Sequence, residues 1–172
     1  IHVYVQKPLT HNVKEARMLT ELARKNKIVT QMGNQGSSNP EQKMVQKWIK
    51  DGRIGKVSTV YTWTNRPVWA QGSPMPKPDP SQKPEGMDWD LWIGPAKNNG
   101  YTPGLHAFSW RGYWEYGTGS LGDMGCHIMD VPIKALGIFD PFSIEASVPR
   151  VPYVADFTPA PVYEESCPPS SY

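Results

Sequence analysis

The sequence predicts an α/β fold with a parallel sheet in its first part and an α+β arrangement in its second part. Two short β-like runs, residues 1–5 and 28–31, flank a helical pattern that begins at Asn12. A strand, a helix and a strand with short links form a βαβ unit, in which the strands are parallel and the crossover is right-handed. The third observation is a later glycine-rich helix that carries polar side chains on one face.

Local signals support each part of the βαβ unit. Pro8 ends the first strand because proline has no N–H for the ladder. Asn12 and Glu15 match the capping-box pattern, and apolar residues follow at helical spacing. The second strand runs into residues 33–36, Gly-Asn-Gln-Gly. Functional groups lie beyond the carboxyl ends of parallel strands, so Lys7 and this loop are expected at the same sheet edge.

The rest of the chain is expected to be less regular. A helix N-cap residue followed by proline predicts a helix start, and alternating apolar and polar residues predict a strand. Pro-rich stretches predict loops. The expected elements are a helix over 39–51, a strand over 57–63, a helical turn over 88–93, a helix that ends at Leu136, and a strand over 142–148. Two parallel strands are too few for a doubly wound sheet. We therefore expect the fold to continue beyond both ends of the chain in the natural protein.

Composition limits the classes of partner. The net charge of +2 gives no electrostatic reason to expect nucleic-acid binding. The content of 38% hydrophobic and 11% aromatic residues is typical of a globular protein and not of a disordered one. No apolar run approaches the roughly 20 residues of a membrane span. Cys126 and Cys167 have neither the spacing nor the context that would predict a disulfide.

The glycine-rich stretch 117–130 contains the most specific chemical pattern. Asp123, His127 and Asp130 are spaced by four and three residues, which places them on one face of a helix. A carboxylate one turn before an imidazole can fix its tautomer and favour its charged form, as a general base requires. A buried histidine satisfied by a neighbouring aspartate is the structural alternative. A metal site is the less favoured chemical alternative, because one histidine and two carboxylates on one helix are a poor set of ligands for zinc.

The order of three motifs resembles the Gfo/Idh/MocA family of nicotinamide-dependent oxidoreductases. These motifs are Gln6-Lys7-Pro8, the loop 33–36, and the set Gly119, Asp123, Gly125 and His127. Family members join a Rossmann domain to a C-terminal α/β domain with an open sheet. The resemblance implies that residues 1–36 are the C-terminal part of the Rossmann domain and residues 37–172 the first part of the substrate domain. Residues 64–67, 88–95 and 110–114 resemble a subgroup from glycan-degrading bacteria.

Two departures from the family pattern affect the cofactor site. Gln6 stands where the family has glutamate, which removes a charge beside Lys7. The G-x-G-x-x-G turn that cradles the pyrophosphate is absent and would lie upstream of Ile1. The choice between NAD and NADP is therefore not readable, and we expect the isolated 172 residues to be inactive.

The resemblance implies roles for individual residues. His127 would be the base, Asp123 would orient it, and Lys7 would donate to the reacting oxygen or to the nicotinamide ribose. The expected cofactor contacts are Lys7, Pro8, His11, Asn34 and Gln35, and the expected substrate contacts are Arg66, Trp69, Trp110 and Arg111. Core packing is an alternative for each tryptophan, a plain turn for Asn34 and Gln35, and a helix start for His11.

The implied activity is hydride transfer between NAD or NADP and a sugar, polyol or related carbohydrate. One alternative is a glycoside hydrolase that uses NAD by transient oxidation, and another is a carbohydrate-binding or interaction module without chemistry. A homo-oligomer is expected for the full-length protein, with neither a nucleic-acid nor a membrane partner. The cytoplasm is the default compartment, and periplasmic export is the alternative.

Overall fold

The computed structural model describes residues 1–148 and 161–169. The chain divides into two compact units, which are described separately. The first unit contains Ile1–Thr64 and Met124–Glu145. The second contains Asn65–Asp123 and the described part of Ala146–Tyr172.

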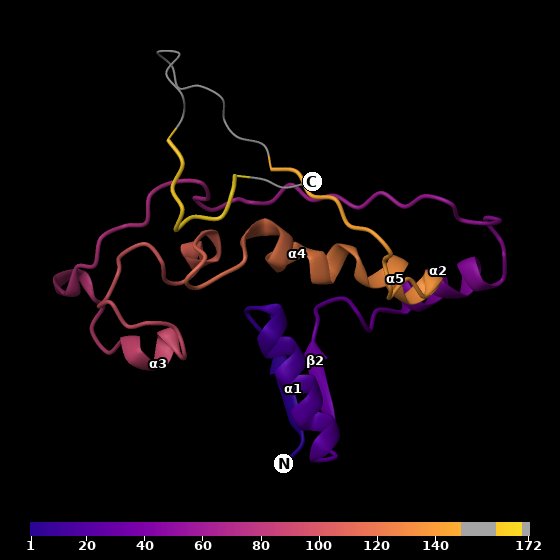
Figure 1. Cartoon of the computed structure of the whole chain (residues 1–172), viewed down its shortest axis with the longest axis horizontal. Coiled ribbons are helices and arrows are strands. Elements are labelled where there is room, and N and C mark those ends of the chain that lie inside the picture. The colour runs from indigo at the N-terminus through magenta and orange to yellow at the C-terminus, as the bar shows by residue number, and fades with distance from the viewer. Residues whose placement is uncertain (149–160, 170–172) are drawn as a thin grey trace. The chain divides into compact units, whose positions relative to one another are not determined.

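The first unit begins with the predicted βαβ unit (Figure 1). Strand β1 (Val3–Gln6), helix α1 (Val13–Lys25) and strand β2 (Thr30–Gly33) follow in order, and the two strands are parallel, with Val3 opposite Thr30. The capping box is confirmed, because the Glu15 amide donates to the Asn12 side chain at 3.0 Å and the Asn12 amide donates back at 3.3 Å. Local signals therefore predicted the elements of this unit and their order correctly, but both strands start two residues later than predicted.

The βαβ unit keeps much of its apolar surface exposed. Helix α1 has no buried residue, and its Leu19 and Leu22 remain about half exposed. On the sheet, Val3 and Val5 are 43% and 39% exposed. A two-stranded sheet with one helix is marginally stable alone, so these faces are suited to further packing.

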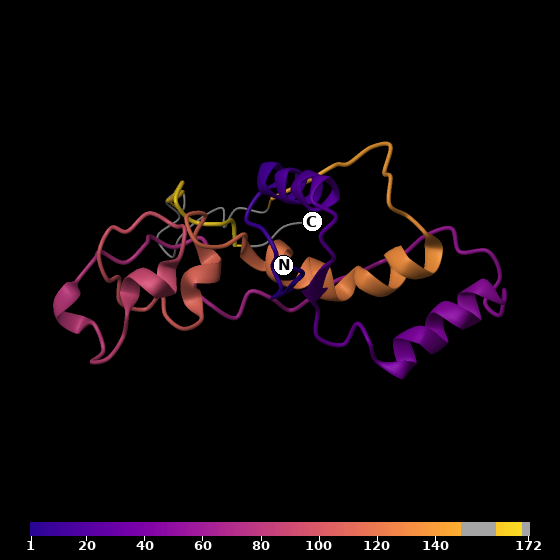
Figure 2. The same cartoon turned by 90° about the horizontal axis from the view of Figure 1, so that it is seen from below.

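The first unit also contains helices α2 and α5 and part of α4. Helix α2 (Pro40–Lys50) begins after Asn39, as predicted, and contacts α5 (Asp130–Leu136) within the first unit (Figure 2). Helix α4 (Gly119–Ile128) precedes α5 in the sequence. Gly137, at a φ of 69°, adopts the left-handed conformation and caps α5.

The expectation of one continuous site helix is wrong. The helix stops at Ile128 and restarts at Asp130, with Met129 between α4 and α5. Pro132 accounts for the interruption, because it has no N–H to donate to the Ile128 carbonyl and its ring crowds that carbonyl. Asp123 and His127 therefore share α4, whereas Asp130 begins a second helix.

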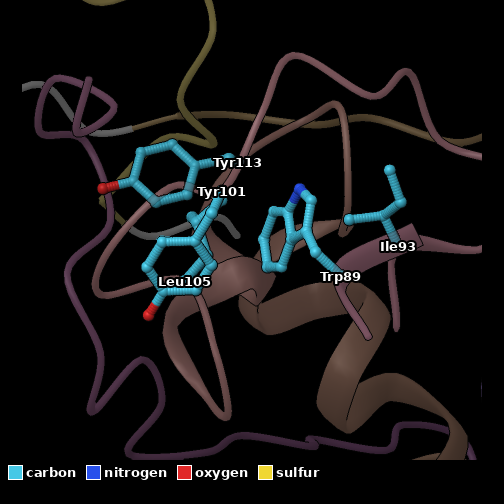
Figure 3. Close-up of a cluster of buried hydrophobic side chains, with 5 residues drawn as sticks. All are labelled: Trp89, Ile93, Tyr101, Leu105 and Tyr113. Carbon is cyan, nitrogen blue, oxygen red and sulfur yellow. The ribbon is translucent and has the colours of Figure 1, made fainter. Parts of the chain in front are cut away.

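The second unit is held together by aromatic packing with little regular structure. Its helix α3 (Trp89–Ile93) and the 3₁₀ turns η1 (Pro80–Gln82) and η2 (Ser109–Gly112) are short. The ring of Trp89 stacks on Trp92, with centroids 4.7 Å apart. The buried cluster consists of Trp89, Ile93, Tyr101, Leu105 and Tyr113 (Figure 3).

A C-terminal strap, residues 163–169, pins distant loops of the second unit. Ser166 forms an isolated antiparallel bridge with Tyr113. The Cys167 amide donates to the Gly112 carbonyl at 2.8 Å, and the Ser166 hydroxyl accepts from the Gly72 amide at 3.0 Å. These partners are more than fifty residues apart in sequence, and no local pattern predicted them.

Two predicted strands do not form. Residues 57–63 and 142–148 contain no strand, and neither segment pairs with a neighbouring strand in the described residues. Trp63 is 80% exposed and Ile144 81% exposed, so neither side chain gains burial. Alternation in sequence therefore did not suffice, because a strand also needs a partner for its backbone groups. Among the described residues, no helix has the length and apolarity needed to cross a membrane.

Candidate active site

Asp123 is paired with Arg111 inside the second unit. The Arg111 Nε lies 3.1 Å from Asp123 Oδ1, and the side chains are 22% and 14% exposed. Arg111 Nη1 also donates to the Phe108 carbonyl at 3.0 Å. A charge-assisted hydrogen bond between partly buried groups fixes the carboxylate more firmly than a surface pair does. Asp123 thus has a cationic partner that was not predicted from the sequence.

Aromatic rings surround the Arg111 guanidinium. Its central carbon lies 4.6 Å from the ring centroids of both Phe108 and Trp110, and 5.9 Å from that of Trp69. Trp69 is 7% exposed and donates its indole N–H to Gln71 at 2.9 Å. The arrangement brings together Trp69, Trp110 and Arg111, which were predicted to contact substrate. The burial of Trp69 fits the packing alternative for that residue.

Asp130 lies in a hydrogen-bonded cluster in the first unit. Lys134 Nζ is 2.8 Å from its Oδ1, and the Ser37 hydroxyl donates to its Oδ2 at 2.7 Å. Burial opposes ionisation of Asp130, but the hydrogen bonds from Lys134 and Ser37 and the charges of Lys134 and His127 outweigh it. The pKa of Asp130 therefore lies below its ordinary value. His127 is close enough to Asp130 for their charges to interact.

The loop after β2 contacts the end of α4. Asn34 Nδ2 donates to the Cys126 carbonyl at 2.7 Å, and Cys126 directly precedes His127. Asn34 Oδ1 is buried and accepts no hydrogen bond within the described residues. The predicted cofactor loop and the predicted catalytic helix are therefore in direct contact within the first unit.

Lys7 and the Gly33 loop lie at one edge of the sheet, as expected. The Lys7 amide donates to the Gly33 carbonyl at 3.0 Å, which extends the pairing of β1 and β2 by one bond. The Lys7 side chain is half-buried, while Pro8 and Gln35 are exposed. His11 donates its amide to the Glu15 carboxylate at 2.7 Å, so its backbone takes part in the start of α1.

The predicted site residues fall into two sets. Lys7, Pro8, His11, Asn34, Gln35 and His127 belong to the first unit, and Arg66, Trp69, Trp110, Arg111 and Asp123 to the second. A depression of about 630 Å³ in the second unit is lined in part by Lys83, Trp89 and Tyr101, and by none of the predicted site residues. Cys126 and Cys167 are not joined by a disulfide. Among the described residues, no group of three His, Cys, Asp or Glu side chains is placed to hold a metal ion.

Ser37 and Lys134 were not among the predicted site residues. Lys134 follows Asp130 by four residues on a helix, which is a readable ion-pair spacing. Ser37 gave no such signal, because its partner Asp130 lies 93 residues away. Its position on the loop after β2 was the only available indication.

Comparison with known proteins identifies the class. The sequence model of the C-terminal α/β domain of an oxidoreductase family matches residues 38–151, about two thirds of the chain. The chain belongs to this family, Gfo/Idh/MocA, which generally uses NAD or NADP. Family membership assigns a general oxidoreductase function to the protein. No curated protein matches the chain.

Proposed function

We propose that the full-length protein transfers a hydride between NAD or NADP and a carbohydrate-like substrate, a sugar or a polyol. One observation carries the proposal: the hydrogen bond from Asn34 to the Cys126 carbonyl. It joins the loop that follows a parallel strand, where nucleotide ligands bind in such folds, to the helix end that carries His127. Cofactor and base would then lie on adjoining segments of one unit.

The residues present fit a nicotinamide cofactor. Asn34 Oδ1 is a buried acceptor without a partner in the described part of the chain, which suits a ribose hydroxyl or an amide N–H of the cofactor. Gln35 is exposed on the same loop, and Lys7 lies at the same sheet edge. The bound nicotinamide would accept the hydride, and the chain's own residues would accept the proton and position the substrate.

Oxidation of an alcohol requires the hydroxyl proton to leave together with the hydride. We assign the proton to His127, which acts as the general base, and the stabilisation of the reacting oxygen to Lys7. Asp123, held by Arg111, and Asp130, held by Ser37 and Lys134, supply fixed negative charge along the α4–α5 segment. Arg66, Trp110 and Arg111 are the candidate substrate contacts.

The exposed apolar faces support the assignment of residues 1–36 to a nucleotide-binding domain. Val3 and Val5 of the sheet and Leu19 and Leu22 of α1 are all well exposed. Additional parallel strands and helices would cover them, as in a doubly wound sheet. In this proposal residues 37–172 belong to the substrate domain.

The decisive test replaces His127 in the full-length protein. We expect His127→Ala to lower kcat/KM by roughly 100-fold or more, because the alcohol loses its proton acceptor. Calorimetry should show a dissociation constant for NAD or NADP that is nearly the same as that of the wild type. His106→Ala is the matched control, since His106 is exposed and its ring packs at a steep angle against that of Trp92.

Two outcomes would change the assignment. Equal turnover in His127→Ala and His106→Ala would remove the general-base role from His127. Hydrolysis of a glycoside without net change in the nicotinamide would indicate transient oxidation by the same residues. Product analysis with glycosides and free sugars separates that activity from a dehydrogenase.

A further inference from the structure

Ser37, Asp130 and Lys134 form a closed triangle of hydrogen bonds. Lys134 Nζ contacts Asp130 Oδ1 at 2.8 Å and donates to the Ser37 hydroxyl at 2.6 Å. The Ser37 hydroxyl donates to Asp130 Oδ2 at 2.7 Å. Each member contacts both others, so loss of any one side chain removes two contacts of the set.

The triangle links the loop after β2 to the start of α5. The bond from Asn34 to the Cys126 carbonyl is a second link, to the end of α4. The Ser37 amide also donates to the Asn34 carbonyl at 3.1 Å, so the two links belong to one turn. His127 lies in sequence between Cys126 and Asp130, the two attachment points.

We propose that Ser37, Asp130 and Lys134 are positioning residues that hold the 34–37 loop on the α4–α5 junction. This inference rests on the proposed function, because it assumes that the 34–37 loop binds the cofactor and that His127 acts on the substrate. The triangle fixes the distance between Asn34 and the helix end that carries His127. Helices α4 and α5 have their own backbone hydrogen bonds, so the loop is the part that shifts when the triangle is broken.

The environment distinguishes this cluster from an ordinary surface ion pair. Asp130 is 12% exposed, and its pair with Lys134 is extended by the Ser37 hydroxyl from a distant segment. The pair Lys47–Asp51 on α2 has the same helical spacing and a distance of 2.7 Å, but its side chains are 72% and 36% exposed. It connects residues of one helix and its cap only. Lys47→Met is therefore a matched control for Lys134→Met.

The test measures nicotinamide binding and steady-state kinetics in the full-length protein. We expect Ser37→Ala and Lys134→Met each to raise the KM and the dissociation constant for the nicotinamide roughly fivefold to tenfold, with kcat within about threefold of wild type. Ser37→Thr and Lys134→Arg retain the donors and should restore most of the affinity. Lys47→Met should match wild type.

The split between KM and kcat and the two conservative variants separate positioning from general loss of folding. Thermal melting of every variant reports whether the fold is retained, and Ser37→Thr and Lys134→Arg keep the test informative if a removal variant is unfolded. No nicotinamide binding by the wild type would reject the proposed function. Binding by the wild type with constants in Ser37→Ala and Lys134→Met equal to those of Lys47→Met would reject the positioning role alone.

Discussion

The guanidinium of Arg111 lies among three aromatic rings, where fewer water molecules compete for its hydrogen bonds. This partial desolvation strengthens the attraction between the guanidinium and Asp123, and the orientation of Asp123 in turn depends on Arg111. Arg111 was predicted from sequence to contact substrate, and that role stays a prediction. Its position beside Asp123 gives it a second task, which is to orient that carboxylate in the middle of α4.

We predict that Arg111→Met lowers the free energy of unfolding by roughly 1–3 kcal/mol, because Asp123 loses its cationic partner while it stays largely buried. The free energy of unfolding of Arg111→Lys should lie between those of the wild type and Arg111→Met, since lysine keeps the charge but lacks the planar guanidinium. Urea denaturation measures both. Lys77→Met, at an exposed position of the same unit, is the control.

A double substitution isolates the ion pair from packing. Arg111→Met combined with Asp123→Asn should be less destabilised than the sum of the single substitutions, because the uncompensated charge is gone. Simple additivity would show that Arg111 acts through its contacts with the rings and not through Asp123.

At the scale of elements, the interruption between α4 and α5 determines where Asp130 can reach. Because Pro132 cannot donate to the Ile128 carbonyl, the helix is interrupted at Met129, and Asp130 starts a new helix in which it pairs with Ser37 and Lys134. Its lowered pKa shows that these contacts favour the ionised form. A carboxyl whose pKa is lower in the folded state stabilises the fold above its ordinary pKa, and this contribution is lost as the pH falls through the folded-state value.

The pH dependence of stability tests this cluster. The ordinary value for Asp130 is 3.8, so its contribution should be complete above that pH and should decline below it. We predict that the difference in unfolding free energy between wild type and Asp130→Asn is largest near neutral pH and shrinks as the pH falls below 3.8. Urea denaturation at several pH values measures the difference. A constant difference over the whole range would show that the ionised form of Asp130 does not stabilise the fold.

The elements that sequence predicted well are those with local causes. The capping box at Asn12, the proline after Asn39 and the left-handed Gly137 each mark a helix end with a few adjacent residues. The break at Met129 was also locally encoded, in Pro132, but the apolar pattern around it concealed the interruption. The strands at 57–63 and 142–148 failed because pairing depends on a partner that alternation does not specify.

The candidate site follows the same rule. The position of His127 on α4 and the placement of Lys7 with the 33–36 loop at one sheet edge were predicted from spacing and topology. The pairing of Arg111 with Asp123 and that of Ser37 with Asp130 join residues from different loops and helices. Such contacts depend on three-dimensional packing, so residue types and spacing alone could not have specified them.

At the scale of the molecule, the second unit relies on one long-range strap in place of a sheet. The strap residues Ser166 and Cys167 are buried against the segments that contain Gly72 and Gly112. Burial raises the pKa of the Cys167 thiol to about 11, so this thiol stays neutral and functions as a packing group. Segments that are far apart in sequence therefore stabilise the loops that present Trp69 and Arg111.

We predict that Ser166→Ala lowers the unfolding free energy of the second unit by roughly 1–3 kcal/mol, because the Gly72 amide loses its acceptor at a site with little water. The same substitution should speed hydrogen exchange at the Gly72 and Cys167 amides, while the amides of α1 exchange at the wild-type rate. Ser58→Ala, at an exposed position, is the matched control and should change neither quantity. If Ser166→Ala and Ser58→Ala exchange and unfold alike, the strap does not hold these loops in solution, and the aromatic cluster around Trp89 alone must account for the stability of the unit.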